Sequence, residues 1–293
     1  MGNTANRGFK PYEELGFTDD FMFGKVMEDF ALCHDVLECL LQRKIGNLEG
    51  AELQKEFQFT DNGKPIRMDV FSRTEDEVFD AEAQNLNKRS ISSLELPKRT
   101  RFYQASVDSD YVKKGHPYKS LPDSTILFIC TFDPFGRNLG RYTFREQCLE
   151  DRSLLLGDGT TKIFYNCTYK GSDLPKDLKE LYKYISTEKI TGALSQQIHE
   201  AVTKARTVEK WRSTYMKEMV LLMDAREEGR EEGRKEGRKE GRKEGWKEGR
   251  EEERRKTEAE RQRADQAEAN CLKAEARVKE LEAMLAAALG SAT

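Results

Sequence analysis

Apolar residues near the start of the chain recur three and four positions apart. This stripe contains Phe23, Val26, Met27, Phe30, Val36, Leu37, Leu40 and Leu41. Such spacing predicts an amphipathic α-helix, because residues three and four apart lie on one helix face. We expect one helix from Asp19 to Gln42, with Thr18 as its N-cap and Gly46 as its stop.

Three short segments after this helix have the composition and length of β-strands. They are Gln54–Thr60, Pro65–Ser72 and Glu77–Gln84. Asp61-Asn62-Gly63-Lys64 separates the first two and predicts a tight hairpin, because Asn-Gly accepts the positive φ that such turns require. Arg73-Thr74-Glu75-Asp76 joins the second pair. The segment is therefore expected to form a meander.

A nearly continuous apolar run, Ser124–Phe132, predicts a strand buried on both faces. It follows a predicted helix from Pro97 to Lys114, where proline suits the first turn and Gly115 suits the end. Two more strands are expected at Arg141–Gln147 and Lys162–Tyr169, with a turn at Gly157-Asp158-Gly159, and two more helices at Lys176–Ile185 and Leu194–Asp224. This order predicts an α/β (α+β) fold, a mixed sheet flanked by helices.

Residues 227–250 are six near-copies of a tetrad with glycine in its third position. In a helix these glycines would spiral around the surface, and each would cost about 1 kcal/mol relative to alanine. The segment therefore predicts either a marginal, solvated helix or a polyampholyte linker. We divide the chain into a domain at 1–223, a linker at 224–256 and a C-terminal segment at 257–293.

The C-terminal segment has apolar and small residues at alternating spacings of four and three. These positions are Ala267, Cys271, Ala274, Val278, Leu281, Leu285 and Ala288. The spacing is typical of a coiled-coil seam. It predicts a homodimer or higher oligomer held by a short coiled coil. A single exposed helix is the alternative.

Overall composition excludes several classes of protein. No apolar stretch reaches the roughly 18 residues that a membrane span requires, so no membrane association is expected. The six cysteines form no CxxC pair and there are only three histidines, which argues against a zinc site. Scattered cysteines are typical of a reducing compartment, so we expect a cytoplasmic protein. The net charge is −3, so any contact with nucleic acid needs a local basic surface.

Acidic residues interrupt two of the predicted strands. Asp69 lies in the second strand, and Glu82-Ala83-Gln84 ends the third. Side chains alternate along a strand, so Asp80, Glu82 and Gln84 share one side. Asp69 should point away from Met68 and Val70 and can share that side if the strands pair.

Two carboxylates on neighbouring strands make an oxygen site suited to Mg²⁺ or Mn²⁺. Asp69, Glu82 and the Ala83 carbonyl would be the metal ligands, and such sites commonly hydrolyse phosphodiesters. Gln84 could position a water molecule or a phosphate oxygen, but it is neither a cation nor a general base. The alternative is a solvent-exposed sheet face with ordinary acids.

Basic residues are concentrated directly after the third strand. Between Lys88 and Lys119 there are eight basic and three acidic residues. Arg101 is the strongest candidate for a phosphate contact, because its forked donors match phosphate geometry. The other candidates for binding nucleic acid are Lys98, Arg99, Lys113 and Lys114. The alternative is a solvated helix face, and we expect Phe102, Tyr103 and Tyr111 in the core.

The order of these motifs resembles the PD-(D/E)XK nuclease superfamily, and within it the recombination-promoting nuclease (transposase) family. The matching segments are Thr18–Lys25, Ile66–Val70, Asp80–Gln84 and Arg101–Tyr118. The resemblance covers about residues 15 to 225, and a low-complexity Glu/Gly repeat after the domain is also familiar from such proteins.

The resemblance implies a Mg²⁺-dependent DNA endonuclease that promotes recombination, with Asp69 and Glu82 as metal ligands. Two positions depart from the superfamily pattern. Gln84 stands where the superfamily has lysine, and Met68 stands where it has proline. The missing lysine leaves a second hypothesis, a catalytically inactive nuclease fold that binds DNA or acts as a scaffold. A DDE-type transposase is a weaker third, because no third acid has a clear structural context.

Overall fold

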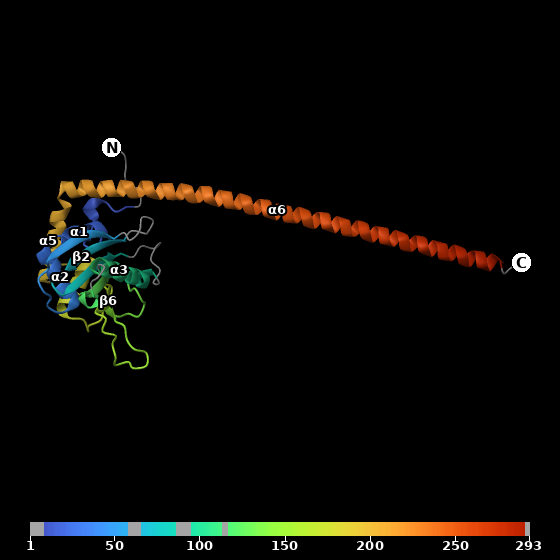
Figure 1. The fold of residues 1–293 in the computed structure, drawn as a ribbon. Helices are drawn as coiled ribbons and strands as arrows, with labels where there is room; N and C mark the ends of the chain where they lie inside the picture. The colour runs from blue at the N-terminus through green and yellow to red at the C-terminus, as the bar shows by residue number, and fades with distance from the viewer. Residues whose placement is uncertain (1–8, 58–65, 86–94, 113–116, 291–293) are drawn as a thin grey trace. The chain divides into compact units, whose positions relative to one another are not determined.

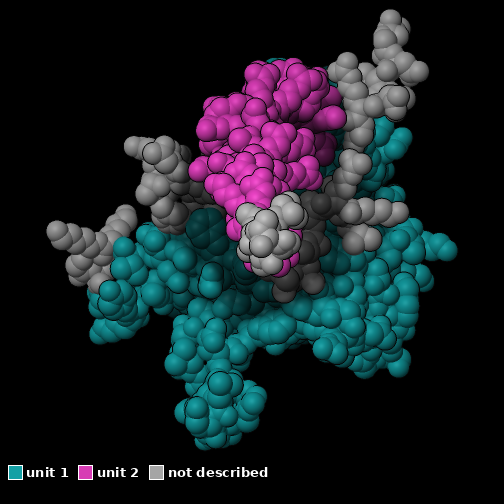
Figure 2. All heavy atoms as spheres, turned by 90° about the vertical axis from the view of Figure 1, so that its right-hand side faces the viewer, with its two compact units in different colours: residues 1–219 teal, residues 220–293 magenta. Residues whose placement is uncertain are grey.

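The computed structural model describes residues 9–57, 66–85, 95–112 and 117–290. The chain divides into two units, residues 1–219 and 220–293, which Figure 2 distinguishes by colour. The first unit is an α/β fold around a mixed sheet (Figure 1). The sheet order is β1-β2-β3-β4-β6-β5. Its strands are β1 Gly50–Phe57, β2 Ile66–Arg73, β3 Glu77–Gln84, β4 Asp123–Cys130, β5 Arg141–Phe144 and β6 Thr160–Asn166.

The first three strands pair antiparallel, as the meander prediction requires, and β3, β4 and β6 pair parallel. β5 closes the sheet antiparallel to β6. The turn between β2 and β3 is confirmed, because the Thr74 N–H donates to the Glu77 carbonyl at 2.8 Å. The predicted hairpin at 61–64 lies outside the described residues. β1 begins four residues earlier than expected, and β5 is shorter, with Gln147 forming only an isolated bridge to Leu155.

Helices cover both faces of the sheet. They are α1 Asp20–Met27, α2 Phe30–Leu41, α3 Glu95–Tyr111, α4 Lys176–Thr187 and α5 Ala193–Arg206. Alternate residues of β4 belong to different apolar clusters. Leu127 and Ile129 pack with α1, α2, α4 and α5, whereas Ile126 and Phe128 pack with α3. This confirms a mixed sheet flanked by helices, with β4 buried on both faces.

The predicted helix from Asp19 to Gln42 is two helices in the structure. Asp29 interrupts it, because its carboxylate accepts the N–H groups of Ala31 and Leu32 and so caps α2. The apolar stripe continues across this break and conceals it. Asp19, rather than Thr18, is the N-cap residue of α1. Gln42, in the left-handed conformation with φ of 57°, ends α2 before Gly46 is reached.

The predicted helix Leu194–Asp224 is also interrupted. α5 ends at Arg206, and α6 runs from Glu209 to Gly290. Tyr215, near the start of α6, packs on Tyr12, with ring centroids 5.7 Å apart. The Tyr12 hydroxyl donates to the Ala205 carbonyl at 2.7 Å. These contacts join the first and last parts of the first unit.

In the second unit, the tetrad repeat is part of α6 and is exposed to solvent. Of the two structures the repeat allowed, the solvated helix is the one observed. A Cβ atom added at any of the repeat glycines, such as Gly237 or Gly241, would meet nothing within 4 Å. Among the described residues, no helix combines the length and the apolar character that a membrane span needs.

Candidate active site

Two reciprocal hydrogen bonds join Asp69 and the end of β3. Backbone pairing of β2 with β3 includes Val70 opposite Ala81. Next to this pair, the Asp69 N–H donates to Glu82 Oε1 at 2.9 Å, and the Ala83 N–H donates to Asp69 Oδ2 at 3.3 Å. Each carboxylate thus accepts from the backbone of the neighbouring strand. The structure therefore brings the two predicted ligands, Asp69 and Glu82, together.

The regular alternation of β2 breaks at Asp69. Strict alternation would place Met68 and Val70 on one face, as the sequence analysis expected. In the structure Met68 belongs to the apolar cluster under α3, and Val70 belongs to the cluster on the other face. That expectation is therefore wrong. The Asp69 amide bonds to a side chain of β3, which accounts for a local departure from the regular pattern.

Arg99 of α3 lies against the acids of β3. Its Nη1 donates to Gln84 Oε1 at 3.0 Å, and its Nη2 donates to Glu82 Oε2 at 3.0 Å and to the Tyr103 hydroxyl at 2.6 Å. The guanidinium carbon is 5.2 Å from the centroid of the Tyr103 ring and 5.5 Å from that of Phe128. Aromatic rings and acceptors together fix the guanidinium beside Glu82.

Burial dominates the electrostatics of this cluster. Glu82 and Asp80 are each 1 % exposed. Burial raises the pKa of Glu82, the charges of Asp69 and Asp80 raise it further, and the Arg99 guanidinium opposes them. Burial also raises the pKa of Asp80, with the charge of Asp69 as the second cause. Within the described part of the chain, neither carboxylate oxygen of Asp80 has a hydrogen-bond partner.

The other predicted site residues do not all belong to this buried cluster. Gln84 is buried beside Arg99, while Lys98 and Arg101 are exposed on α3. Lys113 and Lys114 lie outside the described residues. Tyr103 is buried as expected, and Tyr111 packs against the same apolar cluster. Phe102 is 43 % exposed, so its assignment to the core is wrong: the helix turns Tyr103 inward and leaves its neighbour outside.

Sequence reasoning missed the roles of two residues. Arg99 was predicted as one of several surface contacts to nucleic acid, and the structure places its guanidinium among the acids. Asp80 was placed on the same side as Glu82 but given no role. The signal that could have identified it was a third acid, in phase with Glu82, in a strand that is otherwise apolar.

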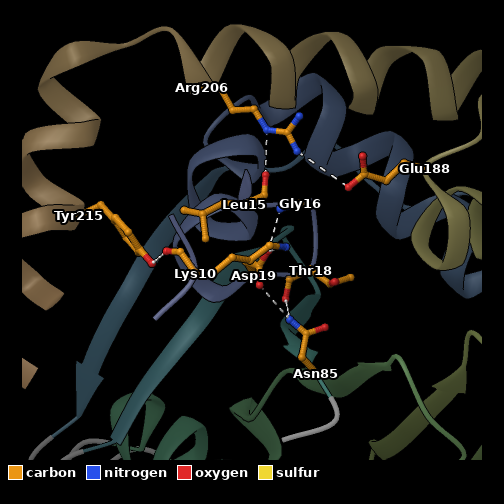
Figure 3. A network of polar contacts seen from close by, with 9 residues as sticks. All are labelled: Lys10, Leu15, Gly16, Thr18, Asp19, Asn85, Glu188, Arg206 and Tyr215. Atoms are coloured by element: carbon orange, nitrogen blue, oxygen red, sulfur yellow. Dashed lines mark hydrogen bonds and ion pairs between the residues drawn. The ribbon is translucent and has the colours of Figure 1, made fainter. Parts of the chain in front are cut away.

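The end of β3 is tied to the start of α1 by Asn85 (Figure 3). Its side-chain amide donates to the Thr18 carbonyl at 2.7 Å and to Asp19 Oδ1 at 3.4 Å. Asp19 also accepts from the Gly16 N–H and from Lys10 Nζ, each at 2.7 Å. The residue directly after Gln84 is therefore anchored to the N-terminal segment, which fixes where β3 ends.

The donor atoms at this site fit a small divalent cation. Carboxylates of Asp69 and Glu82 and the Ala83 carbonyl are hard oxygen ligands, and Mg²⁺ needs only one or two carboxylates because it keeps several waters. Arg99 is one cation beside three acids, and neither oxygen of Asp80 has a hydrogen-bond partner among the described residues, so a further cation would be stabilising here.

Three-ligand clusters among the described residues lie elsewhere. Within the described ranges, His34, Asp35 and Glu38 on α2 are the only three His, Cys, Asp or Glu residues whose ligand atoms lie within 4.8 Å of one another. Glu38 already accepts from Lys44 Nζ at 2.6 Å and from the Ile45 N–H at 3.1 Å. Asp69, Asp80 and Glu82 do not converge to that limit, so this site supplies two carboxylates rather than three.

Comparison with known proteins found no matching protein-family model and no matching curated protein.

Proposed function

We propose that the first unit is a Mg²⁺- or Mn²⁺-dependent DNA endonuclease with a PD-(D/E)XK-type fold, which promotes recombination by hydrolysing phosphodiester bonds. One observation carries the proposal. On adjacent strands, the Asp69 N–H donates to the Glu82 carboxylate and the Ala83 N–H donates to the Asp69 carboxylate, so both carboxylates lie at the end of β3. The fold supports the proposal. Glu82 lies on β3, which pairs antiparallel with β2 on one side and parallel with β4 on the other.

Asp69, Glu82 and the Ala83 carbonyl would hold the cation. A divalent cation bound there supplies Lewis-acid stabilisation and a water of lowered pKa. Gln84 lacks the charge that a lysine would bring, but its amide oxygen accepts from Arg99 at 3.0 Å. Arg99 therefore supplies the cationic group of the site and can stabilise negative charge on a phosphate.

The DNA would approach over the first turns of α3. Lys98 and Arg101 are exposed on this helix on either side of Arg99. Their charges would contact phosphates and position the backbone without reading sequence.

Plasmid cleavage tests this function. The protein should nick supercoiled DNA in Mg²⁺ or Mn²⁺, and Asp69→Ala and Glu82→Ala should each lower the rate at least about 100-fold, since weakening even the groups that orient metal ligands costs 10–100-fold. Asp76→Ala, in the exposed turn before β3, is the matched control and should cleave normally. Nicking that survives both site substitutions would show that the acids do not form the active site.

A catalytically inactive, DNA-binding scaffold is the second candidate. It is favoured by Gln84 in the lysine position and by the two hydrogen bonds that already engage both oxygens of Glu82. DNA binding without cleavage in either metal would support it. In both hypotheses the seam at 267–288 holds two or more copies together. The cytoplasmic location remains a prediction, which the six free cysteines support.

A further inference from the structure

Asp80 is the least explained charged residue of the first unit. It is 1 % exposed, and neither carboxylate oxygen has a partner among the described residues. A buried carboxylate without a compensating contact is strongly unfavourable, and proteins normally pair such groups. Asp80 is therefore a place where a cationic partner would be stabilising.

Arg99 is the cation that lies beside the acids of β3, because its guanidinium donates to Glu82, two positions from Asp80. Asp80 and Glu82 are two positions apart on one strand, so they face the same side with Cα atoms about 6.6 Å apart. The flexible side chain of Arg99 at present donates to Glu82 and not to Asp80.

We propose that Arg99 has two anchoring points, Glu82 in the metal-free protein and Asp80 in the metal-loaded protein. The inference rests on the proposed metal site. A divalent cation at Glu82 and Asp69 would repel the guanidinium that now shares Glu82. Asp80 offers a second carboxylate on the same face. By moving there, Arg99 would keep an anionic partner, remain next to Gln84 and face the phosphate.

This role makes Asp80 a positioning residue that acts through Arg99. Two other roles give different results. Asp80 could ligate the metal itself, in which case Arg99 is irrelevant to its effect. It could also be a passive buried acid, in which case its charge is irrelevant. A double-mutant cycle separates the three, because coupling between two groups appears only when one acts through the other.

The experiment measures Mn²⁺ affinity by calorimetry and by the electron paramagnetic resonance of free Mn²⁺, without DNA. The proteins are the full chain, Asp80→Asn, Arg99→Gln and the double variant, with Asp76→Asn as the control. Asn keeps the shape of Asp80 and removes its charge. We expect Asp80→Asn to weaken Mn²⁺ binding about tenfold in the wild-type background and to have no effect when Arg99 is already Gln. Asp76→Asn should bind like wild type.

Three results would overturn the proposal. They are an unchanged affinity in Asp80→Asn, an equal loss in both backgrounds, and no Mn²⁺ binding by the wild type. Thermal unfolding of each variant confirms that it is folded, and Arg99→Met, which keeps an extended side chain and removes the charge, replaces Arg99→Gln if the latter is not. The predicted cycle in a protein that never cleaves DNA would refute the endonuclease function and leave this inference intact.

Discussion

Glutamate and arginine occur both at the acidic site of the first unit and in the tetrad helix of the second, yet burial gives them opposite properties. At the site, Glu82 is buried and Arg99 donates to it at 3.0 Å. In residues 227–250 every side chain is exposed, and pairs such as Lys235–Glu231, at 3.9 Å, lie in water. An exposed pair contributes about 0–1 kcal/mol, whereas breaking a buried pair costs about 3–5 kcal/mol. The surroundings of a charge decide its effect more than its chemical identity.

The largest effect is expected from removing the buried cation. Arg99→Ala removes the guanidinium that donates to Glu82 and Gln84 and should lower the free energy of unfolding by about 3 kcal/mol. Urea unfolding measures this change. The control is Arg242→Ala in the repeat, which should change stability by no more than about 0.5 kcal/mol. Equal effects of the two substitutions would contradict the contrast between buried and exposed charge.

A measurement of self-association tests whether the helix of the second unit buries one face against another copy of the chain. Leu281 belongs to the predicted seam and is half-exposed in the single chain. Leu281→Asp should weaken self-association at least about tenfold, because it would place a charge inside a coiled-coil interface. Leu272→Asp is the control, since Leu272 is exposed but lies outside the seam. Sedimentation velocity measures both, and dissociation by Leu272→Asp alone would show that the seam is misassigned.

The glycines of the repeat should be replaceable with a gain in stability. Gly237→Ala adds a Cβ atom into open space and should stabilise the helix by about 1 kcal/mol. Circular dichroism during heating measures the gain. Gly159→Ala is the opposite case, because Gly159 has φ of +75° and its Cβ would clash with Asp123 Oδ1. That variant should be destabilised, so stabilisation by both would refute the geometric argument.

A smaller, pH-dependent effect is expected at Asp133, a partly exposed acid after β4. Burial opposes its ionisation, but hydrogen bonds from the Tyr142 hydroxyl and the Asn138 N–H outweigh burial and lower its pKa. A lowered folded-state pKa stabilises the protein above the unfolded value of about 3.9, and this stabilisation is lost as the pH falls through the folded value.

In Asp133→Asn, the free energy of unfolding should therefore depend less steeply on pH under acidic conditions. Urea unfolding between about pH 5 and about pH 3 measures the slope. Tyr142→Phe removes one donor and should give an intermediate slope. A slope steeper than wild type in Asp133→Asn would reverse the assigned sign.

The sequence predicted the parts of the fold that local patterns determine. β3 was placed at its observed bounds, and the buried character of β4 followed from its apolar run. Asp69 and Glu82 were paired from strand alternation, and the structure brings them together although alternation fails at Met68. At Asp69 and Glu82, each carboxylate accepts a backbone N–H of the neighbouring strand, and a two-residue period does not reveal such contacts.

One local contact and one long-range contact explain much of what the sequence did not predict. Asp29 divides an unbroken apolar stripe, because a single capping carboxylate overrides the periodicity on either side. Arg99 resembles its neighbours Lys98 and Arg101 in sequence, and only the packing of α3 on β3 places its guanidinium against Glu82. The helical state of the repeat was left open, because glycine cost and helix continuity oppose each other.

Two contacts of Tyr12 can form only late in the synthesis of the chain. Tyr12 donates to the carbonyl of Ala205 and packs against Tyr215, so its partners are about 200 positions further along the chain. A ribosome that adds 5–20 residues per second needs about 10 to 40 s to reach them. During that interval Tyr12 lacks both of these contacts, and chaperones would have access to it in the nascent chain.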